Sequence, residues 1–104
     1  SYPSTKIVQN SRLVANRLRV TDLRKTVVND LLKVQVTALG ITAKDAQFEY
    51  RFRWLDKDGL EIGTLLSNWN TIYCQAKDTI NMTGVAPSAD ATDFELLVKF
   101  PDRW

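Results

Sequence analysis

The sequence contains no histidine and a single cysteine, Cys74. Without histidine, the commonest general base and the commonest zinc-binding side chain are both absent. A lone cysteine cannot form a disulfide within the chain, and with no histidine to lower its pKa we expect Cys74 to be a buried structural thiol. The sequence also lacks a phosphate-binding glycine loop and the Gly-x-Ser-x-Gly elbow of hydrolases. These absences argue against an enzyme, and no metal or cofactor is predicted.

Long apolar runs are also missing, so the sequence holds no membrane-spanning helix. The polar start, 1–5, is typical of a trimmed linker end, and any signal peptide or lipid-modified cysteine would lie upstream of it. The 104 residues are 44% hydrophobic and 25% charged, which is an ordinary globular composition. We therefore expect one domain spanning 1–104.

The most informative stretch is 46–59, in which four aromatic residues alternate with polar ones. This period of two predicts a half-buried β-strand, and the Asp and Gly residues at 56–59 predict the turn that ends it. The aromatic face should be the centre of the core, because it is the largest apolar payload in the chain. Its members are Phe48, Tyr50, Phe52 and Trp54.

Similar alternation elsewhere predicts an all-β fold. An immunoglobulin-like antiparallel β-sandwich of seven or eight short strands fits this spacing best, although the Cys-Trp-Cys pattern of true immunoglobulin domains is missing. We expect 31–41 to pair with the aromatic strand and the last strand to face it across the core. Segment 12–20 fits both strand and helix periodicity and is interpreted as a strand, followed by a polar connection. The predicted strands are 6–8, 12–20, 31–41, 46–55, 60–62, 69–75, 79–85 and 92–100.

Charge is unevenly distributed along the chain. Residues 1–44 hold eight basic and two acidic residues, which leaves −4 for the remainder of a chain whose net charge is +2. Arg17 and Arg19 lie in this basic part. Its charges indicate either an anionic partner or a set of scattered side chains that keep sheet edges from pairing. No RNA-binding signature is present, so a nucleic-acid partner is not predicted.

The outer face of the aromatic strand is the best candidate for function. Arg51 and Arg53 share it with Glu49 and would bind an anionic ligand or form cross-strand ion pairs. Trp69, beside a loop, would anchor an interface or pack at a sheet edge. The acidic side chains near 56–61 lack EF-hand spacing and fit a turn better than a calcium site. The candidate interaction surface comprises Arg51, Arg53, Trp69, Arg17 and Arg19.

Three features in order carry a resemblance. They are Tyr-Arg-Phe-Arg-Trp-Leu-Asp-Lys-Asp-Gly at 50–59, a mid-chain Trp69, and an Ala-Pro loop at 86–91 before a Phe-bearing last strand. In these features the chain resembles the YcfL family of bacterial periplasmic lipoprotein-like domains, although Leu39-Gly40 stands where that family tends to place an Asn. The resemblance implies a small β-sandwich held by an N-terminal lipid at the outer membrane of a Gram-negative bacterium. It implies no known activity, and relatives look like companions of cell-wall synthesis factors.

Residues and resemblance together predict a non-enzymatic module of the cell envelope that binds a protein or a cell-wall polymer. Contact with the membrane is expected only through the upstream lipid anchor, and the oligomeric state is left open. The alternative is a small-ligand-binding or inhibitor-like domain that uses Arg51, Arg53 and Trp69.

Overall fold

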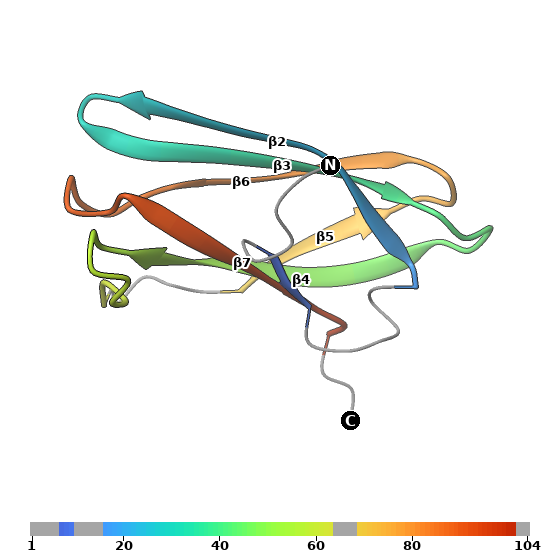
Figure 1. Ribbon diagram of the computed structural model, residues 1–104. Coiled ribbons are helices and arrows are strands. Elements are labelled where there is room, and N and C mark those ends of the chain that lie inside the picture. The colour runs from blue at the N-terminus through green and yellow to red at the C-terminus, as the bar shows by residue number, and fades with distance from the viewer. Residues whose placement is uncertain (1–6, 10–15, 64–68, 102–104) are drawn as a thin grey trace.

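The computed structural model describes residues 7–9, 16–63 and 69–101 as two stacked β-sheets (Figure 1). One sheet has the strand order β1-β7-β4-β5 and the other has the order β2-β3-β6. The described residues form no helix, and the prediction of an all-β fold is confirmed. The seven strands are β1 (Ile7–Gln9), β2 (Leu18–Val28), β3 (Leu31–Gly40), β4 (Ala46–Leu55), β5 (Asn70–Cys74), β6 (Thr79–Val85) and β7 (Asp93–Lys99).

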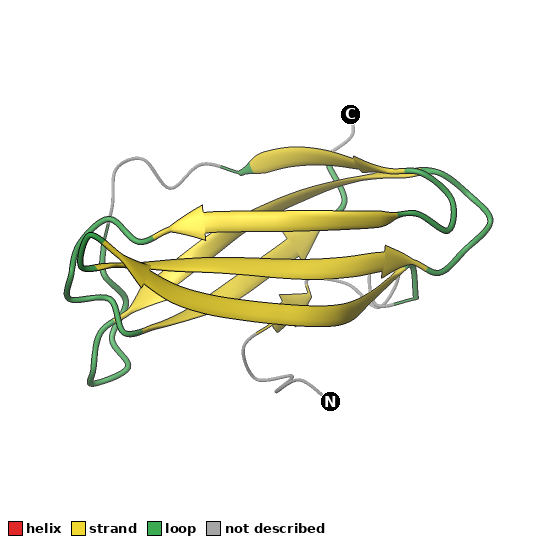
Figure 2. Cartoon of the chain, turned by 90° about the horizontal axis from the view of Figure 1, so that it is seen from above, coloured by secondary structure: helices red, strands yellow, loops and turns green. Residues whose placement is uncertain are grey.

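Most neighbouring strands run antiparallel, but β1 runs parallel to β7. This pair departs from the antiparallel arrangement that the sequence predicted. Seen from above, the strands of the two layers cross at an angle, as packed twisted sheets do (Figure 2). In the part of the chain that the structure describes, no helix is long and apolar enough to span a membrane.

The core lies between the two layers and is built from the alternating residues of four strands. The aromatic face of β4 lies inside as predicted, with Phe52 and Trp54 stacked at 5.4 Å between ring centroids and Tyr50 half-buried. Phe94 of β7 packs edge-on against Phe52 at 5.8 Å. The buried side chains of these strands are Phe48, Phe52 and Trp54 (β4), Phe94, Leu96 and Val98 (β7), Leu32, Val34, Val36 and Ala38 (β3), and Ile80 and Met82 (β6).

Two predicted neighbour relations are wrong. Strand β3 pairs with β2 and β6 in the opposite sheet, so the link after Gly40 crosses between layers instead of joining paired strands. Strand β7 pairs with β4 side by side, Trp54 beside Phe94, and does not face it across the core. Alternation specifies which side chains point inward, but inward-facing residues of either sheet have the same period.

Strand β2 is also longer and later than predicted. The predicted strand began at 12 and ended at 20, whereas β2 spans Leu18–Val28, and 12–15 lie outside the described residues. The expected polar connection is instead a hairpin strand, joined to β3 through Asn29 and Asp30 at φ values of 53° and 66°. Two consecutive positive φ values are those of a type I′ turn. Because β2 is a largely exposed edge strand, its hydrophobic pattern is weak.

The turn after β4 follows the sequence prediction. The Asp56 carboxylate accepts hydrogen bonds from the backbone N–H groups of Asp58 and Leu60, both at 2.9 Å, and Gly59 adopts a φ of 81°. The predicted returning strand 60–62 is reduced to a single bridge between Leu55 and Glu61. The Asp56 side chain therefore shapes the turn.

Candidate functional site

The outer surface of β4, β5 and β7 collects charged and aromatic side chains that we call the charged face. Arg51 and Arg53 project from β4, and register places Glu95 of β7 beside Arg53 and Lys99 of β7 beside Glu49. The aromatic members are Trp69, which precedes β5, and Tyr73 of β5, which is 70% exposed. The charged face is therefore defined by Glu49, Arg51, Arg53, Trp69, Tyr73, Glu95 and Lys99.

Trp69 is the centre of the charged face. Arg51 Cζ lies 5.5 Å from the centroid of the Trp69 ring, and Lys99 Nζ lies 4.5 Å from the same centroid. Cations at these distances are attracted by the negative face of the indole, with about 0.5–1 kcal/mol per contact at an exposed site. The indole ring is half-buried, and a cation from β4 and another from β7 hold it in a defined position.

Arg53 is held by carboxylates. Its Nε donates to Glu61 Oε1 at 3.2 Å, and its Nη1 lies 3.3 Å from Glu95 Oε1. Lys99 Nζ similarly lies 3.7 Å from Glu49 Oε1. The predicted cross-strand ion pairs are therefore present at Arg53. Exposed pairs of this kind contribute at most about 1 kcal/mol each, so they order the surface more than they stabilise the fold.

The structure separates the five predicted interaction residues into groups. Arg51, Arg53 and Trp69 share the charged face, but Arg17 lies at one end of the sandwich with its Cζ 5.9 Å from the Phe100 ring centroid. Arg19 is exposed on β2, in the opposite sheet. The structure therefore places Arg51, Arg53 and Trp69 on one face and does not bring Arg17 or Arg19 to it.

Lys99 and Tyr73 belong to the charged face and were absent from the predicted set. Lys99 was recognisable as an outward residue of the last strand, but its position over Trp69 follows from the β4–β7 register, which pairs Glu49 with Lys99. Tyr73 pairs with Gln47 across the β4–β5 ladder. Only the pairing of β4 with β5 and β7 shows that Lys99 and Tyr73 lie on the same face as Arg51 and Arg53.

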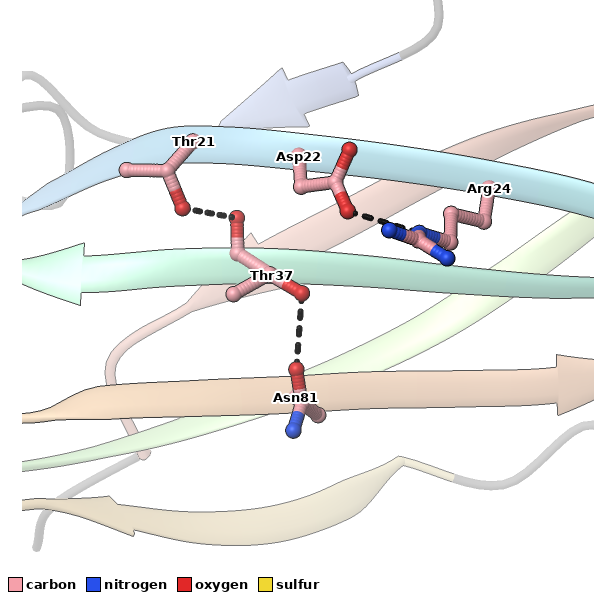
Figure 3. Close-up of polar contacts among 5 residues, drawn as sticks. All are labelled: Thr21, Asp22, Arg24, Thr37 and Asn81. Carbon is pink, nitrogen blue, oxygen red and sulfur yellow. Dashed lines mark hydrogen bonds and ion pairs between the residues drawn. The ribbon is translucent and has the colours of Figure 1, made fainter.

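The outer surface of the other sheet has a different character, and we call it the hydroxyl–amide face. Thr37 Oγ1 donates to Asn81 Oδ1 at 2.7 Å, and Thr21 Oγ1 donates to the Thr37 carbonyl oxygen at 3.4 Å (Figure 3). At its β2 margin, Arg24 Nε donates to Asp22 Oδ2 at 2.9 Å. The face is defined by the outward residues of β3 and β6 that are polar and uncharged, which are Gln35, Thr37, Thr79, Asn81 and Thr83.

Cys74 lies beneath the surface where β3 approaches β5. The side chain is 3% exposed, and its Sγ–H group donates to the carbonyl oxygens of Gln75 at 3.6 Å and Asp78 at 3.7 Å. Burial, with a smaller contribution from the Asp78 charge, raises the pKa of the thiol above that of a free cysteine. Such a thiol stays protonated at neutral pH and is a poor nucleophile. The prediction that Cys74 is buried is confirmed.

Acidic and thiol side chains do not gather into a metal site in the described ranges. No group of three or more His, Cys, Asp or Glu residues there is placed to hold a metal ion. Three hollows on the described surface are lined by other segments: the turn at Asp56 with Asp90, the end of the sandwich at Arg17, and the groove between Val27 and Ala91. None of these three hollows includes Arg51, Arg53 or Trp69.

Fold and surface together define a small all-β domain of two packed sheets whose best-organised surface feature is a face of ion pairs and stacked cations. The chain belongs to the family described as "Protein of unknown function (DUF1425)", which it matches over residues 5–100. A lipoprotein-like family such as the one suggested by the aromatic strand, Trp69 and the Ala-Pro loop is consistent with this membership.

Two solved structures are similar to this chain. The crystal structure of Campylobacter jejuni cj0090 has a TM-score of 0.75 at 22% identity and covers 92% of this chain and 98% of its own. The crystal structure of a DUF1425 family member from Shewanella sp. pv-4 also has a TM-score of 0.75 at 22% identity, with coverage of 83% and 80%. At this identity the likeness supports the fold alone. No curated protein matches the chain.

Proposed function

We propose that this domain is a non-enzymatic binding or accessory module of the Gram-negative cell envelope, and that it docks its partner on the charged face. The observation that carries the proposal is the Trp69 cluster, in which Arg51 and Lys99 hold one half-buried indole on a solvent-facing sheet. Holding an aromatic plate in place before binding lowers the entropy that association would otherwise cost.

The composition of the charged face supports a macromolecular partner. Tryptophan, tyrosine and arginine are the residues that most often dominate binding energy at protein interfaces. Tyr73, at 70% exposure, extends the Trp69 cluster along β5. Because Arg53 and Glu95 carry opposite charges side by side, the face suits a partner with mixed polarity. An envelope protein or a cell-wall polymer with charged and hydroxyl groups has this chemistry.

The location in the envelope rests on the resemblance to periplasmic lipoprotein-like domains. In this proposal the domain lies in the periplasm, and an upstream lipid anchor holds it at the outer membrane.

The fold supports an immunoglobulin-like interpretation, since β3 pairs with β6 in one sheet and β4 with β7 in the other. Immunoglobulin-like sandwiches are common in binding proteins, but that likeness alone assigns no function.

The small-ligand alternative has less support. A small-molecule site is normally a concave pocket that encloses its ligand. The three hollows described above are lined by residues other than Arg51, Arg53 and Trp69. Arg53 also has Glu61 and Glu95 as neighbours, which compete with an anionic ligand.

Chemical crosslinking of the full-length protein in its native envelope tests the proposal. We expect one or a few discrete adducts, which weaken at least about tenfold when Trp69→Ala removes the centre of the face. Thr26→Ala is the matched control, because Thr26 is an exposed outward residue of β2 in the other sheet. Purified cell-wall sacculi, sedimented with the same three proteins, test a polymer partner.

Two results would contradict this proposal, the first its binding role and the second its docking surface. The first is an envelope screen without any specific adduct combined with no sedimentation on sacculi. The second is an adduct or co-sedimentation that Trp69→Ala leaves unchanged, which would place the partner on another surface. A hydrolase activity of the purified domain that survives Cys74→Ala would contradict the non-enzymatic part.

A further inference from the structure

The described strands leave four sheet edges, which differ in how well they are protected against pairing with another strand. Natural proteins blunt edges with short strands, charged side chains, prolines or bulges. Strand β2 carries four charged residues and a register shift between Val20 and Asp22. Strands β1 and β5 are short, with three and five residues. The fourth edge, β6, has none of these features.

Strand β6 is a long, regular and uncharged edge. Its seven residues, Thr79–Val85, contain no charged residue and no proline, and the β3–β6 register is continuous from Leu39–Thr79 to Lys33–Val85. Among the described strands, none pairs with the other side of β6. Its outward side chains are exposed, including Val85 at 54%. A regular edge without a protecting device is a template for a further strand.

Asn81 supplies an independent indication at the middle of this edge. Its Oδ1 accepts the hydrogen bond from Thr37, and in Figure 3 its amide nitrogen points away from Thr37. Within the described residues the structure gives this NH₂ group no hydrogen-bond partner. The hydrogen bonds that run from Thr21 through Thr37 to Asn81 therefore end at β6 with an exposed amide NH₂ group.

We propose that β6 pairs antiparallel with β6 of a second copy of this chain, about a twofold axis at Met82. In this register Asn81 lies opposite Thr83 of the second copy, and Thr83 lies opposite the second copy's Asn81. Opposed residues have Cβ atoms about 4.5–5.5 Å apart, so the amide of Asn81 reaches the Thr83 hydroxyl. The hydroxyl–amide face then runs unbroken across both copies.

The inward residues also fit this register. Ile80 lies opposite Gly84 of the second copy, and each of these positions is already packed within its own core. Gly84 has no room for its own side chain, because a Cβ there would lie 2.5 Å from Phe52 Cδ2. The outermost pair joins Thr79 to Val85, two β-branched residues suited to a sheet. No pair brings like charges together.

The second copy is favoured over another protein's strand because the edge complements itself in chemistry: Asn81 and Thr83 lie opposite each other at both ends of the pairing. An uncharged edge gives no charge by which it would select a foreign peptide. A pair of seven-residue strands buries less than the roughly 1,200 Å² of a stable interface, so the dimer should be reversible. This inference concerns a surface other than the charged face and does not depend on the proposed function.

Sedimentation velocity of the purified chain, from about 10 µM to about 1 mM, measures the association. We compare the wild type with Thr83→Lys on the β6 edge and with Thr26→Lys, the matched substitution on the β2 edge of the same face. Wild type and Thr26→Lys should form dimers with the same dissociation constant. Thr83→Lys should weaken dimerisation at least about tenfold, because it adds two charges to the paired edge.

A disulfide trap keeps the proposal testable if Thr83→Lys disturbs folding. In a Cys74→Ala background, Asn81→Cys with Thr83→Cys should give intermolecular disulfide-linked dimers on oxidation, whereas Arg24→Cys with Thr26→Cys on β2 should not. A wild type that stays monomeric throughout, a dimer unaffected by Thr83→Lys, or equal trapping by both cysteine pairs would overturn the proposal. A β6 edge that crosslinks only to another protein in the envelope would also overturn it.

Discussion

On the charged face, Arg53 lies 3.3 Å from Glu95 and Lys99 lies 4.5 Å from the Trp69 ring, whereas on the hydroxyl–amide face Thr37 donates to Asn81 at 2.7 Å. The first face is held by charges and an aromatic plate. The second is held by neutral hydrogen bonds and ends at an unprotected edge. One sandwich thus offers two surfaces with different partner chemistry, and we assign partner binding to the first and self-association to the second.

Both faces depend on one core, and Gly84 tests this dependence most strongly. A Cβ at Gly84 would lie 2.5 Å from Phe52 Cδ2 and 3.1 Å from Trp54 Cζ2, so Gly84→Ala should overpack the space between β6 and β4. We expect a loss of about 1–3 kcal/mol in the free energy of unfolding, measured by urea denaturation. Far-UV and tryptophan signals should fall together, because both faces lose support.

Gly63→Ala is the control for that substitution. A Cβ at Gly63 meets nothing within 4 Å, so its effect should stay within about 0.5 kcal/mol. Equal losses at Gly63 and Gly84 would show that the close contact with Phe52 is not the cause.

Salt should distinguish the faces at a smaller energy scale. Arg53→Ala removes ion pairs to Glu61 and Glu95 and should cost about 0.2–1 kcal/mol at low ionic strength, with most of this cost absent at about 1 M salt. Thr37→Val removes the hydrogen bond to Asn81 and should cost about 0.5–1.5 kcal/mol at either ionic strength. Denaturation of both variants in both buffers measures the contrast. If the stability loss of Arg53→Ala were the same at both salt concentrations, the proposed contrast between the two faces would be contradicted.

The smallest expected effect on the free energy of unfolding is the pH dependence that Cys74 contributes. Burial raises the pKa of this thiol in the folded state above that of a free cysteine. The unfolded chain therefore loses the thiol proton first as pH rises, so the stabilisation from the protonated thiol is complete below the unfolded pKa and is lost as pH rises through the folded pKa. The difference in unfolding free energy between wild type and Cys74→Ala should be constant near neutrality and shrink in alkaline solution. A constant difference would contradict the raised pKa.

The sequence predicted the inward faces better than the strand neighbours. Phe48, Phe52 and Trp54 are buried as their alternation indicated, because period two is a local property of the chain. The pairing of β4 with β7 instead of β3 depends on how the sheets assemble, which a local pattern does not specify. Strand β2 was misplaced because an exposed edge needs little hydrophobic alternation.

For the candidate site, too, the sequence predicted which way side chains point but not which strands are neighbours. Arg51 and Arg53 were assigned to the outer side of the aromatic strand, where the structure has them, because side-chain direction follows from strand parity. The cluster with Trp69 required the register that brings Lys99 of β7 onto the same ring. Arg17 and Arg19 were included because of local charge, and local charge does not report which sheet a residue occupies.

The most direct test of the account compares the two faces inside the cell. A photoreactive amino acid is placed in the full-length protein at Tyr73 on the charged face or at Val28 on β2, which are both exposed, at 70% and 48%. We expect a discrete adduct with a partner from the probe at Tyr73, lost when Trp69→Ala is added, and no adduct of that mass from the probe at Val28. The same adduct from Val28, or none from Tyr73, would contradict the assignment of partner binding to the charged face.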